Sequence, residues 1–389
     1  MKPDSNLTHD QGEAISLYIH VPFCRRKCSY CDFYFSTNRK RQSDMVDAMV
    51  REIELRKDFG QNNGELRTVY LGGGTPSVLE SDEFRRLFGT INGHFSIQKG
   101  AEITLEANPE DLTEAKLQAM AEVGINRLSI GLQSFYQDDL DWMNRAHSPE
   151  QVGEGMALAR SMGISNITLD LMFGLPGLSM SRWESNIEQA VALEPDHVSL
   201  YALSVEKKTA LRNWVKEGKM ELPPDELVEA QYLFANNVLW NAGFEHYELS
   251  SFAQKEKQAQ HNSAYWRGLP YLGIGPSAHS FDGDCRSWNI ANNSRYIDML
   301  SKGELPVEEV EELSEEERLN EYVMTRLRLQ EGLSLPELEE AFEVDFWEAH
   351  APYIDSLLRS GQLWRKSDRI GLTPRGWIVS DSLIAEFFV

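Results

Sequence analysis

Short apolar segments alternate with amphipathic segments along the first two hundred residues. Six segments rich in Val, Ile, Leu, Tyr and Thr predict strands at 16–20, 67–71, 102–106, 127–131, 166–171 and 197–201. Residues 43–56, 111–123 and 149–162 carry apolar side chains at helical spacing, and Gly124 and Gly163 follow two of them as C-terminal stops. Strands alternating with helices predict βα units around a parallel sheet. Six units are too few for a closed eight-strand barrel, so the pattern predicts an α/β fold with a partial (β/α)6 barrel.

The pattern changes after residue 304. Residues 306–317 hold seven glutamates and no basic residue, which predicts a linker or the exposed start of a helix. Helical patterns follow at 317–329, 335–342 and 353–360, and a short ribbon is expected at 363–372. The chain is therefore predicted to contain a partial-barrel domain, 1–304, and a small, mainly helical, winged-helix-like domain, 305–389.

Composition and charge narrow the class of protein. The chain has 389 residues, 41% of them hydrophobic, and no uncharged apolar run of about 18 residues, so no membrane span is expected. The polar N-terminal segment lacks the apolar core of a signal peptide, and four cysteines do not form a disulfide framework. We therefore expect a cytoplasmic protein.

A nucleic-acid partner is not expected. The formal net charge is −23, and binding to nucleic acid depends on Lys and Arg. Winged helices often bind DNA, but residues 301–389 hold 9 Lys and Arg against 20 Asp and Glu, a net charge of −11. A DNA-binding regulator is therefore the weakest of the functional interpretations.

Three cysteines lie within eight residues. Cys24, Cys28 and Cys31 have the spacing C-x3-C-x2-C, and soft thiolates select iron–sulfur clusters. A structural zinc site normally has four protein ligands, whereas three thiolates leave one iron of a 4Fe–4S cluster open to another ligand. A zinc site completed by a distant histidine and an incidental group of thiols are the alternatives. Tyr30 and Phe33 are expected to shield the cluster from water, and Cys285, far away, is expected to be a plain thiol.

Unusual residues follow every predicted strand. The cysteine loop follows the first strand, and the others lead into 72–76 (GGGTP), 106–109 (EANP), 131–135 (GLQSF), 170–177 and 201–204. Because the C-terminal ends of parallel strands share one face, these segments are expected to converge on one mouth. Glu106 and Asp170 end apolar strands, where a charge needs a partner. That partner is either a ligand or a polar contact within the fold.

The C-x3-C-x2-C spacing resembles the radical S-adenosylmethionine (radical SAM) superfamily. The resemblance implies that the amino and carboxylate groups of S-adenosylmethionine (SAM) chelate the open iron, and that an electron from the cluster cleaves SAM to a 5′-deoxyadenosyl radical. It also implies a reducing donor of the flavodoxin or ferredoxin type. The basic run 25–27 in the cysteine loop is either a contact for such an acidic donor or a solvated loop.

The string 18–24, YIHVPFC, together with GGGTP, EANP, GLQSF, DLMFGLP and the C-terminal module, resembles the HemN/HemW family over nearly the whole chain. This family contains oxygen-independent coproporphyrinogen III oxidases (HemN) and haem chaperones (HemW). Carried over by motif, the resemblance implies that the SAM site is lined by Tyr18, Tyr30, Gly73, Gly74, Thr75, Glu106, Gln133, Arg145, Asp170 and Ala202.

Two departures from the oxidases favour the chaperone branch. The position of the oxidases' fourth cysteine is Phe33, and only 23 residues precede Cys24, where the oxidases have a longer arm. The string from His261 to Trp266, HNSAYW, resembles the motif associated with haem binding in HemW-like proteins. His261 could ligate haem iron, and Tyr265 and Trp266 offer flat apolar area to a porphyrin, although a lone histidine more often serves as a hydrogen-bonding residue.

His279 is either a second haem ligand or part of the SAM pocket. The resemblance implies a haem chaperone that carries a 4Fe–4S cluster and SAM, binds haem as cargo and transfers it to acceptor proteins, notably of respiratory membranes. A homodimer is also implied. The alternative is an oxygen-independent coproporphyrinogen III oxidase in porphyrin biosynthesis, and a radical enzyme on another substrate is a third interpretation.

Overall fold

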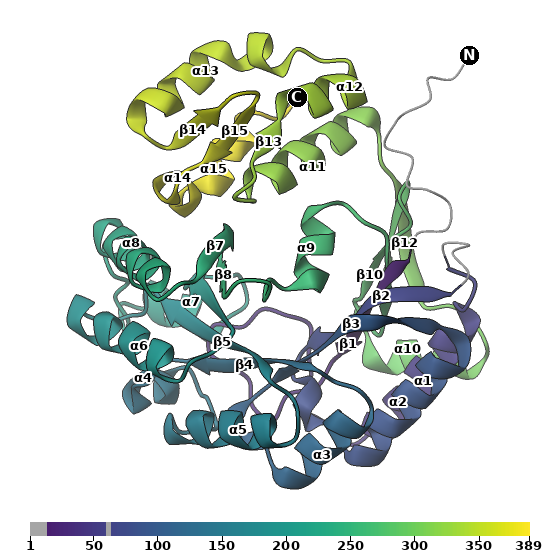
Figure 1. Cartoon of the computed structure of the whole chain (residues 1–389). Helices are drawn as coiled ribbons and strands as arrows, with labels where there is room; N and C mark the ends of the chain where they lie inside the picture. The colour runs from purple at the N-terminus through teal and green to yellow at the C-terminus, as the bar shows by residue number, and fades with distance from the viewer. Residues whose placement is uncertain (1–13, 60–63) are drawn as a thin grey trace, which may run out of the picture.

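The computed structural model describes residues 14–59 and 64–389 (Figure 1). Its larger sheet has twelve strands in the order β12-β11-β10-β9-β1-β2-β3-β4-β5-β6-β8-β7. Six consecutive strands at its centre are parallel. They are β1 (Ile15–Val21), β2 (Glu65–Gly73), β3 (Ser96–Ala107), β4 (Arg127–Gln133), β5 (Asn166–Phe173) and β6 (His197–Ala202). The predicted partial (β/α)6 barrel is confirmed.

Helices cover the outer face of these strands (Figure 1). They are α1 (Gln42–Leu55), α2 (Ser81–His94), α3 (Glu114–Glu122), α4 (Gln137–Trp142), α5 (Glu150–Ser161) and α6 (Met180–Ala192), with short 3₁₀ turns η2 (Pro76–Val78) and η3 (Pro109–Asp111). The three predicted helices are confirmed as α1, α3 and α5. Gly124 and Gly163 follow α3 and α5 with φ of 91° and 89°, which glycine adopts without strain.

The two faces of the parallel strands differ in chemistry. In β2, Val69 and Leu71 are fully buried in the apolar core, while Thr68 and Tyr70 alternate with them and pair in register with Glu102 and Thr104 of β3. Successive side chains of a strand point to opposite faces, so the apolar set meets the helices and the polar set lines the inside of the barrel. Polar groups inside a barrel require partners, and the site below is built from them.

The chain extends the sheet at both edges. The helices and strands that follow β6 in the chain form these two extensions. They are α7 (Ala210–Lys216), α8 (Asp225–Asn241), β7 (Glu245–Glu248), β8 (Ser251–Ala253), α9 (Gln260–Trp266), β9 (Tyr271–Ile274), β10 (His279–Phe281), β11 (Cys285–Asn289) and α10 (Asn293–Ser301). Strand β8 pairs with β6, and β9 pairs with β1. The fully buried carboxylate of Glu52 in α1 ties the extension next to β1, from β9 to α10, to the barrel. It accepts hydrogen bonds from Gly275 N, Asn289 Nδ2 and Tyr296 Oη at 2.9, 2.7 and 2.5 Å.

The acidic segment was expected to be a linker or helix start, and this expectation was wrong for residues 307–312. They form β12 (Val307–Glu312), which pairs with β11 at one edge of the large sheet. Charged side chains on an edge strand discourage pairing with another chain, so the glutamates suit this position. The helix α11 (Glu315–Leu327) begins only after the capping box of Ser314. The division at residues 304 and 305 stays a prediction.

The remaining elements form the small C-terminal domain: α11, β13 (Leu333–Ser334), α12 (Leu335–Phe342), α13 (Phe346–Ser360), β14 (Leu363–Lys366), β15 (Arg369–Leu372), α14 (Pro374–Ile378) and α15 (Ser380–Ala385). The predicted helices and ribbon are confirmed. The domain sits over β7 and α9 (Figure 1), and Leu249 N donates to Arg328 O at 3.0 Å. Among the described residues, no helix combines the length and apolar character that crossing a membrane requires.

Candidate functional site

The cysteine loop begins where β1 ends. Cys24 N donates to Ser36 O at 3.1 Å and Ser36 N donates to Pro22 O at 2.9 Å, so the loop leaves and returns at one point. Cys28 and Cys31 form a tight turn within it, since Cys31 N donates to Cys28 O at 3.3 Å. All three thiols are partly exposed. One loop at a strand end therefore presents three potential ligands.

A buried carboxylate anchors this loop. Arg25 Nε donates to Asp111 Oδ1 at 2.8 Å, and Ser77 Oγ donates to Asp111 Oδ2 at 2.8 Å. Asp111 is only 1% exposed, so these charge-assisted hydrogen bonds are strong. Arg25 is thus tied to the fold although its side chain is 41% exposed. Arg26 and Lys27 are exposed as well, and both interpretations stay open for them.

Burial favours the neutral form of two of the three thiols, those of Cys24 and Cys31. Burial raises the pKa of Cys24 to about 12, with a partly compensating hydrogen bond from Thr75 Oγ1 at 3.4 Å, and raises the pKa of Cys31 to about 11. Iron binding would therefore release protons. In the described residues, no three His, Cys, Asp or Glu side chains converge as ligands of a single metal ion. A cubane places each thiolate on a different iron, which suits spread thiols. The sequence predicts that Phe33 shields the cluster from water. In the structure Phe33 is 71% exposed and does not cover the cysteine loop.

The glycine triplet at the end of β2 is required by close packing. A Cβ on Gly73, whose φ is 105°, would lie 2.6 Å from His20 Nδ1, and one on Gly74 would lie 2.7 Å from Phe23 O. The glycines therefore let the end of β2 lie directly against β1 and the cysteine loop. As a consequence, the hydroxyl of Thr75, the residue after the triplet, reaches the thiol of Cys24.

Two carboxylates lie on the neighbouring parallel strands β3 and β5, Glu106 near the end of β3 and Asp170 within β5. Tyr70 Oη donates to Glu106 Oε1 at 2.7 Å, and Ser129 Oγ donates to Asp170 Oδ2 at 3.0 Å. Burial raises the pKa of Glu106 to about 7 and that of Asp170 to about 6, and the charge of Asp170 adds to the shift of Glu106. A cationic ligand or a ligand with hydroxyl donors would favour the ionised forms.

Arg145 links the cysteine loop to β4. Its Nη2 donates to Asn108 Oδ1 at 2.7 Å and to Gly131 O at 2.6 Å, and its Nη1 lies 3.7 Å from Cys28 Sγ. Burial opposes the charge, but Tyr30 and Cys28 hold the pKa of Arg145 above its ordinary value. A guanidinium in this position can accept a carboxylate in fork geometry.

Gln133 supplies an independent sign of a ligand. Its φ is 71°, and its Oε1 atom is buried without a hydrogen-bond partner among the described residues. A buried acceptor left unpaired costs about 1–3 kcal/mol, so this oxygen calls for a hydrogen-bond donor that a bound ligand would supply. The residues present therefore fit a polar cofactor with hydroxyl or amino donors.

Two further predicted SAM residues lie on β1 and β6. Tyr18, on the inner face of β1, has its hydroxyl 3.0 Å from His20 Nδ1. Ala202 is exposed at the end of β6. Sequence reasoning missed Tyr70, Ser129, Asn108 and Asp111, which hold Glu106, Asp170, Arg145 and Arg25 in place.

The structure places the histidine of the HNSAYW string inside the fold. His261 is 0% exposed, its Nδ1 lies 2.8 Å from Thr68 Oγ1, and its Nε2 lies 3.1 Å from Tyr265 Oη. The imidazole stacks on Tyr70 at 4.9 Å, and burial lowers its pKa to about 3. Ligation of haem iron by His261 stays a prediction that would require the ring to leave these partners. His279 instead stacks on Trp288 at 5.6 Å.

Comparisons with known proteins agree with this architecture. The family model of the radical SAM superfamily matches residues 18–190, and that of the HemN C-terminal domain matches residues 313–379. Among solved structures, coproporphyrinogen III oxidase (HemN) from Escherichia coli superposes with a TM-score of 0.84, over 98% of this chain and 92% of that one, at 21% identity. Such a likeness shows the fold.

Curated relatives match nearly the whole chain. The heme chaperone HemW of Bacillus subtilis is 32% identical over 378 residues, which are 96% of this chain and 98% of the relative. That of Mycobacterium tuberculosis H37Rv is 33% identical over 377 residues, 96% of this chain and 94% of the relative. That of Escherichia coli is 30% identical over 380 residues, 96% of this chain and 98% of the relative.

The partial barrel and the three-cysteine loop at the end of its first strand define a radical SAM protein. Within that class, the chain belongs to the heme chaperone HemW family.

Proposed function

We propose that this chain is a cytoplasmic haem chaperone that binds haem and transfers it to an acceptor protein. The proposal is carried by one observation, the similarity to heme chaperone HemW proteins over 96% of the chain. A respiratory membrane protein as acceptor, an acidic electron donor near the exposed Arg26 and Lys27, and a homodimer are further parts of the proposal.

The cofactors are a 4Fe–4S cluster on Cys24, Cys28 and Cys31 and one SAM molecule. When bound, the cluster supplies an open iron for SAM and an electron that can reach it. Arg145 would receive the carboxylate of SAM, and Glu106 and Asp170 would attract its sulfonium or accept hydrogen bonds from its ribose. The contacts of Tyr70 and Ser129 hold these two carboxylates in position.

The function is tested on one anaerobically reconstituted sample. We expect haem to bind in a defined ratio to the chain and to move to an apo-acceptor, with no conversion of coproporphyrinogen III. Haem titration, product analysis and a 5′-deoxyadenosine assay measure these outcomes. Formation of protoporphyrinogen would instead assign the chain to the coproporphyrinogen oxidases, and a sample that takes up no haem would refute the chaperone function.

The affinity for SAM is expected to rise with pH up to about neutrality. Asp170 and Glu106 have pKa values of about 6 and about 7 in the free protein, so they are protonated below this range and ionised above it. Only the ionised pair attracts a sulfonium. Each proton that SAM displaces changes the affinity for SAM by up to tenfold per pH unit. Titrations of the reconstituted protein between about pH 5 and about pH 8, an interval that extends roughly one unit beyond each value, measure the profile.

A matched variant distinguishes the titration of these carboxylates from the titration of SAM itself. Glu106→Gln keeps a polar side chain of the same size but removes one titrating group, so its profile is expected to lose the step near neutrality. Identical profiles for the variant and the unmodified protein would show that Glu106 does not face the bound cofactor.

A further inference from the structure

Aromatic side chains continue the inner face of the barrel beyond β1. Tyr271 of β9 pairs in register with Ser16, an inner-face residue of β1, and with Phe281 of β10. Residues two apart on a strand point to the same side, so His279 lies beside Phe281 on this side of β10. Its partner in register on β11 is Trp288. The aromatic face defined in this way consists of Tyr271, Phe281, His279 and Trp288.

The imidazole of His279 is open to a ligand. The side chain is exposed, and its ring stacks on that of Trp288 with the centroids 5.6 Å apart. No described residue forms a hydrogen bond with either of its ring nitrogens. Burial lowers the pKa of His279 and the charge of Arg286 adds to the shift, so the ring is neutral at neutral pH. Neutral imidazole is the form in which histidine binds metal ions, including the iron of haem.

The lower part of the aromatic face is held in place by Arg286, the partner of Phe281 in register. Its Nη1 and Nη2 donate to the two carboxylate oxygens of Glu321 in α11 at 2.6 and 2.8 Å. The same guanidinium lies over the ring of Phe281, 5.8 Å from its centroid. Because Arg286 is already paired, its charge is not assigned to any cargo. Fixed flat rings lose little freedom on binding, so this face is preorganised for a flat apolar ligand.

The HNSAYW string supports the aromatic face from α9. Tyr265 packs edge-on against Tyr271, with the ring centroids 4.5 Å apart. Its hydroxyl lies 3.1 Å from Nε2 of His261, whose Nδ1 lies 2.8 Å from the Thr68 hydroxyl inside the barrel. The buried histidine thus fixes Tyr265, and Tyr265 fixes one edge of the aromatic face. This connection lets His261 influence haem binding without any contact with the iron.

The aromatic face borders the mouth of the barrel. Burial lowers the pKa of His20, near the end of β1, and the charge of the nearby His279 adds to this shift. Gly73, at the end of β2, packs against the same histidine, and β1 leads directly into the cysteine loop. Cargo on the aromatic face would therefore lie beside the proposed cofactor site.

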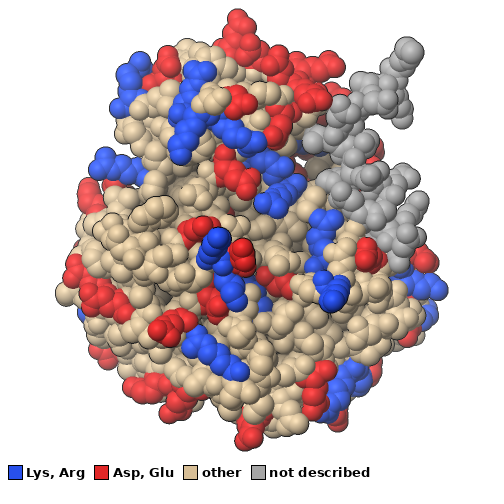
Figure 2. All heavy atoms as spheres, in the orientation of Figure 1, with Lys and Arg blue, Asp and Glu red and all other residues tan. Residues whose placement is uncertain are grey.

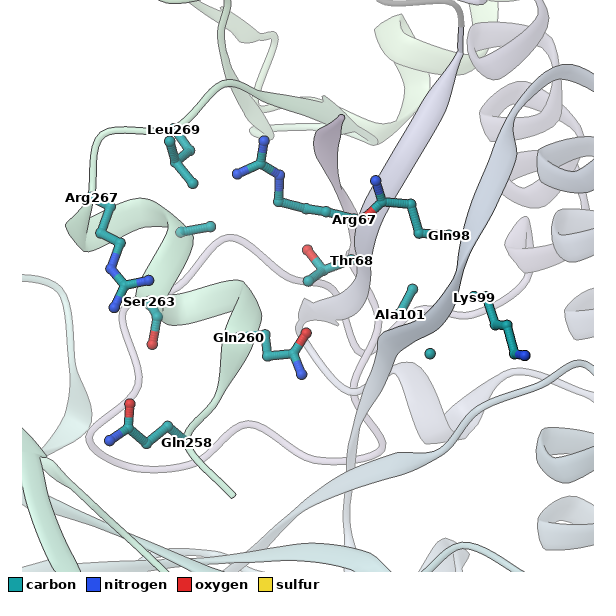
Figure 3. Close-up of a pocket in the computed structure, with 12 residues that line it drawn as sticks. Arg67, Thr68, Gln98, Lys99, Ala101, Gln258, Gln260, Ser263, Arg267 and Leu269 are labelled. Carbon is teal, nitrogen blue, oxygen red and sulfur yellow. The ribbon is translucent and has the colours of Figure 1, made fainter. Parts of the chain in front are cut away.

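The other side of α9 faces a pocket that suits haem poorly. The pocket has a volume of about 440 Å³ and lies between α9 and the early parts of β2 and β3 (Figure 3). Its described lining includes Gln260, Ser263 and Arg267 but no histidine, cysteine, methionine or aromatic ring, so it offers neither an iron ligand nor a flat surface. Figure 2 shows acidic and basic side chains intermingled over the barrel on the side that it displays, so charge alone selects no place for an anionic cargo there.

We propose that the aromatic face binds the porphyrin ring of haem and that His279 is the axial ligand of its iron. The inference rests on the proposed function and deepens it, because it names the ligand and the surface that hold the cargo. Glu309 and Glu311 of β12 are the partners in register of Trp288 and Arg286, so the two propionates are expected to point away from β12. An open face with one protein ligand also suits a carrier that has to release its cargo.

His279→Ala is the test variant, since an exposed side chain can be removed without opening the core. We expect ferric haem to bind the full-length, reconstituted variant at least about tenfold more weakly, because even outer-shell partners of a metal are worth roughly that factor. The absorption and electron paramagnetic resonance signals of an imidazole-ligated iron are expected to disappear and to return when free imidazole is added. His94→Ala, the same change at an exposed position of α2, is the matched control and is expected to bind haem unchanged.

Metal-free protoporphyrin separates the iron ligand from the aromatic face. It keeps the flat ring and both propionates but has no iron, so His279→Ala and the unmodified protein are expected to bind it equally. Trp288→Ala removes flat apolar area instead, and it is expected to weaken the binding of haem and of the metal-free ring alike. Thermal melting of each variant confirms that it is folded. A metal-free ring that binds as tightly as haem to the unmodified protein would exclude an iron ligand from this site.

His261→Ala distinguishes the two histidines. Because His261 acts through Tyr265, we expect a smaller loss of haem affinity, with the signals of the imidazole-ligated iron retained. Unchanged affinity and spectrum in His279→Ala, or loss of these signals in folded His261→Ala alone, would overturn the assignment of His279 while leaving the chaperone function intact. An unmodified protein that binds no haem would refute both.

Discussion

Replacing Cys28 by Ala is expected to abolish the iron–sulfur cluster. The loop offers three thiols to the cluster, and a cubane held by two thiolates has two irons without protein ligands. The change also removes the sulfur that lies 3.7 Å from Arg145 Nη1, so a buried cation loses a neighbour. We expect iron and sulfide contents near zero after anaerobic reconstitution, together with loss of the charge-transfer absorption of the cluster.

Cys285→Ser is the control for this experiment. Cys285 lies in β11, outside the loop, and is expected to leave iron and sulfide contents unchanged. Full iron content in Cys28→Ala would show that another residue serves as the third ligand. Zinc in place of iron in unmodified protein prepared without oxygen would exclude a cluster on this loop.

The central strands could be predicted because burial on the helix side imposes a strong apolar pattern. The strands β7, β8 and β10 could not, since they have three or four residues and pair antiparallel at positions that tertiary packing selects. The strand β12 was missed because its glutamates are typical of a linker or of the exposed start of a helix. Nothing local distinguishes that from an edge strand, where the same charges prevent further pairing.

The cysteine loop and the strand-end motifs could be predicted because ligand type and spacing are local features. The residues that hold them were missed, although a signal existed. Thr68 and Tyr70 interrupt an apolar strand at every second position, and strands buried on both faces normally read as continuous apolar runs. That alternation indicates a polar barrel interior, which is where Tyr70 meets Glu106.

The environment of His261 could not be read from the sequence. Its partner Thr68 is 193 residues away along the chain, and the string HNSAYW shows only that a histidine, a tyrosine and a tryptophan are close together in the sequence. The fold decides which side of the helix each one faces. The helix α9 was not among the predicted elements, and the direction of the imidazole depended on the packing of α9 against β2.

Replacing Arg145 by Ala is expected to weaken SAM binding about a hundredfold, because truncating one partner of a buried charged pair costs about 2–5 kcal/mol. Arg145 stands between the cysteine loop and β4, bonded to Asn108 and Gly131, where a carboxylate on the open iron would meet its fork. Arg145→Lys keeps the charge but loses the planar fork, so an intermediate affinity is expected. Calorimetric titration of the reconstituted protein with SAM measures each affinity.

The same variants distinguish binding of SAM from support of the loop. Arg145 Nη1 lies 3.7 Å from Cys28 Sγ, so Arg145→Ala could also disturb the cluster, and iron content must be measured on the titrated sample. Arg160→Ala, at an exposed position of α5, is the control. Normal iron content with weakened SAM binding places Arg145 against the cofactor. A lower iron content, with unchanged affinity for SAM in the molecules that do carry a cluster, would show that Arg145 acts only by holding the cysteine loop. The cofactor would then make no contact with its guanidinium.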